Sequence, residues 1–127
     1  MRDYVVYNNP DSVGDLYKEN PLSVFTNKKV STEVIGSRVW LIVGEGRPRS
    51  YFLRCWFFVD HIDWGKEHGF ATKLSGSEGV VFEPMTLLPG DEEWFLSFKK
   101  DQGNFAFGFS SIKNSQTIVH LEQIAQL

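Results

Sequence analysis

Two arginines lie two residues apart in the polar stretch GEGRPRS at positions 44–50, immediately before an aromatic-rich segment. Pro48 stands between them and stiffens the chain, so the guanidinium groups of Arg47 and Arg49 could contact neighbouring phosphates of a nucleic acid. The chemistry that this spacing allows is anion binding. A polar hairpin tip that contacts only water is the other interpretation of the same residues.

A second group of candidate binding residues lies at Phe25, Asn27 and Lys28, in a segment that fits no regular element. Recognition of a nucleobase calls for an aromatic ring, an amide and a cation. The amide pairs with the base edge while an aromatic ring stacks on the base face. An asparagine that only stabilises a loop would have the same local sequence. Both interpretations of Asn27 stay open at this point.

The ten residues at 51–60, YFLRCWFFVD, combine five aromatic side chains with one arginine. Side chains alternate along a strand, so Tyr51, Leu53, Cys55, Phe57 and Val59 are expected to form a core face. The opposite face would then carry Phe52, Arg54, Trp56, Phe58 and Asp60. That face could be covered by a C-terminal helix, could form a dimer interface, or could border a groove where Trp56 stacks and Arg54 pairs with an anion.

The sequence offers little that suggests catalysis. Asp60, His61, Asp63, Glu67 and His68 are the densest set of possible metal ligands, but their spacing matches neither a zinc-protease motif nor a calcium loop. Cys55, the only cysteine, is expected to be a buried structural thiol. No glycine-rich phosphate-binding motif or nucleophile elbow occurs. We therefore expect neither an enzyme nor a cofactor or metal site.

Charge is unevenly distributed along the chain, although the net charge is only −3. Positions 28–54 hold six basic and two acidic residues, whereas positions 55–93 hold two basic and eight acidic ones. A polarised surface could steer an anionic ligand to one side. Clustering without function is the alternative.

The 127 residues suit one domain spanning 1–127, and 42% hydrophobic residues indicate an ordered core. A single cysteine excludes an internal disulfide framework. The sequence lacks a secretory leader and a membrane-spanning apolar stretch, so a cytoplasmic location is expected.

Local patterns predict strands at 4–7, 39–43, 51–60, 80–82, 94–99 and 105–109, the last with Phe105, Phe107 and Phe109 on one face. The loop at 44–50 makes an antiparallel hairpin of the second and third strands. A short helix is expected within 11–20, a loop with one helical turn at 83–93, a strand or a loop at 70–74, and a helix capped by Ser115 in the tail. Five or six strands with peripheral short helices predict an α+β fold built on a curled or barrel-like sheet.

The order of a YVVYN strand, an irregular VFTNKK segment, a GSRVWLIV strand and an aromatic strand resembles that of small PUA-like β-barrels, in particular the EVE and ASCH branch. Residues 36–40 occupy the place of that family's glycine-containing motif. Ser37 stands where an acidic residue is usual, and the first strand lacks the tryptophan typical of EVE domains. The resemblance covers about the first half of the chain; the remainder agrees only in strand number.

The resemblance implies that RNA or a modified DNA base binds in a pocket beside the segment after the first strand. Phe25, Asn27 and Trp40 would line that pocket, and Arg47, Arg49 and Arg54 would face the nucleic acid. We therefore predict a non-catalytic nucleic-acid-binding module that reads a modified or flipped base. The alternative is a protein-interaction or homodimerisation domain that uses the aromatic face of 51–60 and binds no nucleic acid.

Overall fold

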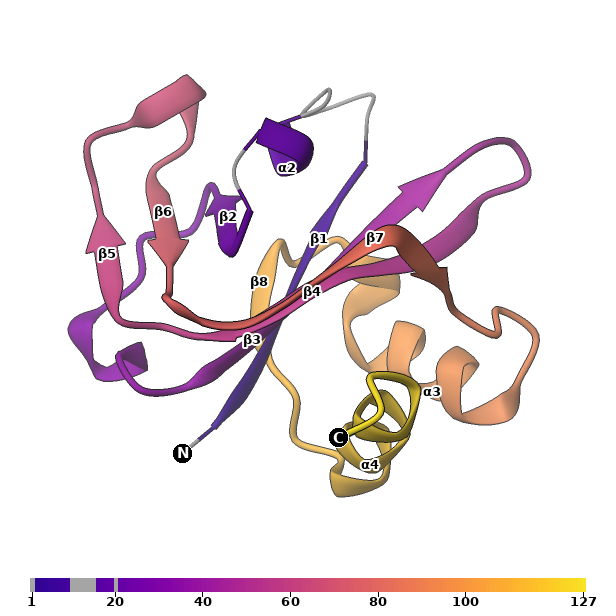
Figure 1. Ribbon diagram of the computed structural model, residues 1–127. Coiled ribbons are helices and arrows are strands. Elements are labelled where there is room, and N and C mark those ends of the chain that lie inside the picture. Colours follow the sequence, from indigo (N-terminus) through magenta and orange to yellow (C-terminus); the bar gives the residue numbers. More distant parts are fainter. Residues whose placement is uncertain (1, 10–15, 20) are drawn as a thin grey trace.

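The computed structural model describes residues 2–9, 16–19 and 21–127 (Figure 1). The strands are β1 (Asp3–Asn8), β2 (Ser23–Thr26), β3 (Arg38–Glu45), β4 (Ser50–Phe58), β5 (His61–Asp63), β6 (Thr72–Ser75), β7 (Glu78–Leu87) and β8 (Phe109–Ser111). The α-helices are α2 (Leu16–Glu19), α3 (Glu93–Asp101) and α4 (Ser115–Ile124), and short 3₁₀ turns are η1 (Thr32–Val34), η2 (Glu67–Gly69) and η3 (Gly103–Phe105). The described part of the chain is therefore a β-rich α+β fold.

The strands form two sheets. The larger has the order β7-β4-β3-β1-β8, and the smaller has the order β2-β6-β5. β1 runs parallel to β3, with Asp3 opposite Arg38, and all other neighbours in the two sheets are antiparallel. Neither sheet closes on itself within the described residues, so the expected barrel is corrected to a pair of open sheets.

The larger sheet is buried on both faces, which explains the unusually apolar sequence of its central strand β3. On one face, Val6 and Leu41 belong to an apolar cluster with the small-sheet residues Val24 and Leu74. On the other face, a second cluster joins the sheet to helices α3 and α4. Figure 1 shows the helices and the small sheet on opposite sides of the long strands. A strand covered on both faces needs a continuous apolar run, and VWLIV supplies one.

The expected alternation along β4 is interrupted at Arg54. Leu53 packs in the helix-side cluster with Trp56, whereas Cys55 and Phe57 pack in the small-sheet cluster. The register with β7 shifts between Leu53 and Cys55, so one extra residue in the strand reverses which face each later side chain takes. The prediction of one unbroken core face through 51–60 is therefore wrong. Helix cover of Trp56, one of the three interpretations, is what the structure has.

Residues 94–99 form part of α3 and not the strand that their aromatic content predicted. Phe95 and Phe98 are buried three residues apart, while Leu96 between them is 51% exposed. This spacing is that of one helix face. Glu93 in the first turn and Lys99 and Lys100 in the last turn favour the helix through its dipole.

The strand predicted at 105–109 is also wrong, except at its last residue. Phe105 ends the η3 turn, and only Phe109 enters β8. Gly103, Asn104, Phe105 and Gly108 all have positive φ, so the backbone turns repeatedly and cannot stay extended. Phe105 points into the helix-side core, and Phe107 is left 48% exposed.

Three other expectations have mixed outcomes. The hairpin of β3 and β4 is confirmed, and so is the tail helix, α4, with Leu121 fully buried. Its N-cap is Asn114 and not Ser115, since the Asn114 side-chain oxygen accepts the Gln116 N–H at 2.9 Å. The segment 83–93 does not begin as a loop, because β7 continues to Leu87. The short helix expected within 11–20 is seen as α2, and the rest of that range lies outside the described residues.

None of the helices among the described residues has the length and apolar composition needed to cross a membrane.

Candidate functional site

A cleft of about 520 Å³ opens where the end of β1, the end of β2 and the segment after η3 come together. Small-molecule sites in proteins typically measure about 300–1,000 Å³. The described residues that line it are Tyr7, Asn8, Asn9, Phe25, Thr26, Asn27, Lys28, Phe70, Asn104, Phe105, Ala106, Phe107 and Gly108. This set is rich in aromatic rings and side-chain amides, so the chemistry of the cleft favours a flat polar ligand.

Aromatic contacts fix the shape of the cleft. Tyr7 stacks on Phe105 with ring centroids 5.1 Å apart and an interplanar angle of 11°. On the β2 side, the Phe25 ring lies 5.8 Å from that of Phe70. Phe25 is buried while Phe107 is exposed, so the first supports the wall and the second offers a ring to a ligand.

Backbone hydrogen bonds hold the segment after β2 in a position that presents its side chains to the cleft. The Thr72 hydroxyl donates to the Lys28 carbonyl at 2.7 Å and accepts the Val30 N–H at 3.4 Å. The Lys28 N–H donates to the Thr26 hydroxyl at 3.2 Å. Because these bonds use only backbone atoms of residues 28 and 30, the side chains of Asn27 and Lys28 remain exposed.

Trp40 does not line this cleft, unlike Phe25 and Asn27. It lies on the central strand β3 and is fully buried on the helix side of the sheet. Its indole Nε1–H donates to the Asp3 carboxylate at 2.9 Å. The structure therefore brings two of the three predicted pocket residues together and gives the third a role in the core.

Arg47 and Arg49 lie in the turn between β3 and β4, where Arg47 is exposed and Arg49 half-buried. Arg49 donates to the Gly44 carbonyl at 3.5 Å. A Cβ atom at Gly44 would collide with both the Arg49 side chain and the Tyr7 hydroxyl, so these two side chains lie side by side over that glycine. Because Tyr7 lines the cleft, Arg49 lies at its border, while Arg47 extends the positive charge outward.

Arg54 and Trp56 are buried, and neither reaches the cleft. The Arg54 guanidinium donates to the Phe82 carbonyl at 3.3 Å and to the Glu83 carboxylate at 3.0 Å. It also lies over the Tyr17 ring. Buried in this way, Arg54 fills the bulge opposite β7 and is not a surface cation for nucleic acid.

Arg38 is likewise internal. It donates to the Asp3 carboxylate at 2.6 Å and to the Glu122 carboxylate at 3.0 Å, joining β3, β1 and α4. With Arg38 and Arg54 both paired inside, the basic balance of positions 28–54 is reduced at the surface. Lys28, Lys29 and Arg47 are the exposed cations of that segment.

The acidic segment at 60–68 has local structural roles. Asp60 accepts the Ser77 hydroxyl at 2.8 Å and the Ser77 N–H at 2.9 Å, and these bonds lower the pKa of its carboxyl group. Asp63 accepts the Gly65 N–H, and Glu67 pairs with Lys73 at 3.5 Å. The described residues contain no group of three or more His, Cys, Asp or Glu side chains placed to hold a metal ion.

Cys55 is buried 2% exposed within the small-sheet cluster, and this burial raises the pKa of its thiol to about 12. We expect the native protein to resist a thiol reagent at pH 8 and to react with one equivalent after unfolding in guanidinium chloride. Because the unfolded thiol ionises near pH 8.5 and the folded one does not, this group also lowers stability as pH rises from about 8.5 toward 12. Rapid stoichiometric labelling of the folded protein would contradict this assignment.

Sequence reasoning missed several lining residues, chief among them Asn104 and Phe107. The 105–109 segment was noticed only as a strand, because its alternating phenylalanines matched that pattern. The signal for a turn was the Gly-Asn pair at 103–104, since these residue types accept positive φ. Asn8 and Asn9 were read only as the end of the first strand.

Comparison with known proteins assigns the chain to no family: no protein-family model matches it, and no curated protein matches it.

Proposed function

We propose that this protein is a non-catalytic nucleic-acid-binding module that holds one nucleobase in the cleft between β1, β2 and the 104–108 segment. The observation that carries the proposal is the meeting of Phe25, Asn27 and Lys28 with the exposed ring of Phe107 in one cleft. Phe107 offers a face for stacking, Asn27 an amide for the base edge, and Lys28 a cation for the adjoining phosphate.

The remaining lining residues agree with this ligand. Three further asparagines, at positions 8, 9 and 104, line the cleft, and the lining residues that the structure describes include no acidic side chain. Amides can donate and accept at once, which suits the mixed donors and acceptors of a base edge. A base out of the helical stack, in a single strand or flipped from a duplex, is the form that such a cleft can admit.

A PUA-like relationship remains part of the proposal. In those domains the pocket lies beside the segment that follows the first strand, and here the cleft is lined by Asn8 and Asn9 at the end of β1 and by the end of β2. The sheets are open among the described residues, so the likeness concerns the place of the pocket and not a closed barrel.

The alternative of a homodimerisation surface on the aromatic face of β4 has less support. Trp56, which would be central to that surface, is 8% exposed and packs in the helix-side cluster. The side chain is therefore used inside the fold.

Asn27→Ala is expected to weaken binding of a short labelled oligonucleotide about 10-fold, because the variant leaves a base edge without its hydrogen-bond partner. Lys28→Gln should weaken binding and lower the slope of log K against log salt by about 0.7 for a single strand, as one phosphate contact is lost. Fluorescence anisotropy titrations at several salt concentrations measure both effects.

Matched controls are Gln123→Ala and Lys100→Gln, two exposed residues that do not line the cleft. Both should bind like the unmodified protein. The panel should contain single- and double-stranded DNA and RNA, with methylated DNA included. Absence of binding to every member at low salt would refute the proposed function.

A further inference from the structure

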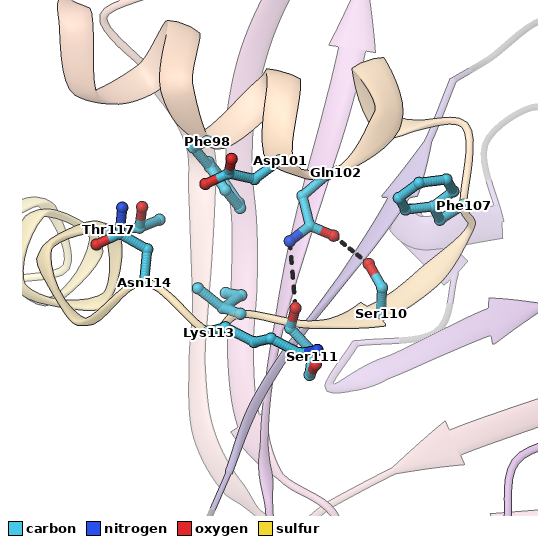
Figure 2. Close-up of a pocket in the computed structure, with 10 residues that line it drawn as sticks. Phe98, Asp101, Gln102, Phe107, Ser110, Ser111, Lys113, Asn114 and Thr117 are labelled. Carbon is cyan, nitrogen blue, oxygen red and sulfur yellow. Dashed lines mark hydrogen bonds between the residues drawn. The ribbon is translucent and has the colours of Figure 1, made fainter.

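A second cleft, of about 580 Å³, lies between the end of α3, strand β8 and the start of α4 (Figure 2). Its described lining residues are Phe98, Asp101, Gln102, Phe107, Ser110, Ser111, Ile112, Lys113, Asn114 and Thr117. Figure 2 shows Phe107 at one end of this cleft and Asn114 and Thr117 at the other.

Phe107 is shared by both clefts. A small hollow between them, also lined by Phe107, has Tyr7 and Phe105 in common with the first cleft and Gln102 and Ser110 in common with the second. The two clefts are therefore consecutive parts of one groove, and the Phe107 ring divides it.

The ring is exposed but held in place. Phe107 is 48% exposed, and its ring packs directly on the Gly103 backbone, where a Cβ atom would meet ring carbons at 2.7 Å. A ring supported at one edge and open to solvent can take a base on its free surface, and stacking on such rings is tolerant of base identity.

The second cleft offers polar groups that complement a nucleotide. Gln102 is engaged internally, since its Nε2 donates to the Ser111 carbonyl at 3.2 Å and its Oε1 accepts the Ser110 hydroxyl. Lys113 is exposed and supplies a cation for a phosphate. Asp101 is the only acidic residue among the described residues that line either cleft. It would repel a phosphate, but it can accept a hydrogen bond from the amino group of a base.

We infer that the groove binds two successive nucleotides of a single strand, with Phe107 inserted between their bases. The first base lies by Asn27 and the second by Asp101, while Lys28 and Lys113 hold phosphates toward the two ends. This inference rests on the proposed function and extends it from one base to a two-nucleotide step of single-stranded nucleic acid.

The test compares three ligands by isothermal titration calorimetry: adenosine monophosphate, the dinucleotide pApA, and adenosine 3′,5′-bisphosphate. The bisphosphate adds charge without a second base. The unmodified protein should bind pApA about 10-fold or more tightly than either of the others, a gain of the size that one stacked base gives. Phe107→Ala should remove this preference, whereas Phe107→Trp should keep it.

Lys113→Gln should weaken binding of pApA and leave binding of the monophosphate unchanged. Leu96→Ala, which truncates an equally exposed apolar residue outside both clefts, should change neither. Thermal unfolding of each variant confirms that it is folded. If Phe107→Ala keeps the preference for pApA, or if the unmodified protein has none, the two-nucleotide groove is refuted. Binding of the monophosphate that is sensitive to Asn27→Ala would still support the single-base site. Failure of all three ligands to bind would refute the groove, and failure of the longer oligonucleotides as well would refute the proposed function.

Discussion

Arg38→Met is expected to lower the free energy of unfolding by about 3–5 kcal/mol, the usual effect of removing one partner of a buried ion pair. The Arg38 and Asp3 side chains are 7% and 8% exposed, and their atoms lie 2.6 Å apart. Without the guanidinium, the Asp3 carboxylate keeps only the Trp40 indole as a hydrogen-bond donor among its printed contacts, in a site closed to water. Its charge would then be buried and largely uncompensated.

Equilibrium unfolding in urea, followed by circular dichroism, measures this effect. Arg47→Met is the matched control, since the same side chain is removed at an exposed position, and a change below about 0.5 kcal/mol is expected there. Asp3→Asn combined with Arg38→Met removes both charges and should recover part of the loss. A cost below about 1 kcal/mol for Arg38→Met would show that the network contributes little to the fold.

Phe95→Ala is expected to destabilise the protein by about 3–5 kcal/mol, because it leaves a cavity at the centre of the helix-side core. The Phe95 side chain is fully buried. Its ring centroid lies 5.3 Å from that of Tyr51 and 6.0 Å from that of Phe105, so one truncation removes contacts to β4 and to η3.

Leu96→Ala supplies the comparison and also tests the secondary structure of this segment. In α3 the Leu96 side chain is 51% exposed, and its truncation should cost less than about 0.5 kcal/mol. In a strand, residues 94, 96 and 98 would share one face, and Leu96 would be as important as Phe98. Urea titrations of both variants distinguish the two cases: a large effect of Leu96→Ala with a small effect of Phe95→Ala would contradict the helix.

The parts of the fold that sequence predicts well have local, uninterrupted patterns. The run VWLIV at 39–43 is too apolar and β-branched to be anything but a buried strand, and its hairpin with 51–60 follows from two glycines and a proline. The tail helix is also predictable, since Ile118, Leu121 and Ala125 recur at helical spacing.

The failures arise where tertiary contacts outweigh local preference. Residues 94–99 have strand-forming aromatics, yet the helix wins because it buries Phe95 and Phe98 together against the sheet. The reversal of faces at Arg54 depends on the register with β7, which no single strand encodes. Closure of the sheet was overestimated for the same reason, because strand number alone does not determine which edges meet.

The candidate site was partly predictable. Phe25, Asn27 and Lys28 were identified by residue type, and they do line a cleft. Their counterparts Asn104 and Phe107 lie far away in sequence, so only the folded chain shows that the two segments face each other. Trp40 and Arg54 had suitable chemistry, but their strands are central and their side chains are needed inside.

The place of β1 in the larger sheet has a consequence for synthesis of the protein on the ribosome. β1 lies between β3 and β8, with Tyr4 opposite both Val39 and Ser111. The first strand made can therefore complete its pairing only after nearly the whole chain has emerged, and such long-range pairing is slow. Until then one edge of β1 is an open row of backbone donors and acceptors. A chain shortened before residue 109 would keep that edge permanently and should aggregate by adding strands from other copies.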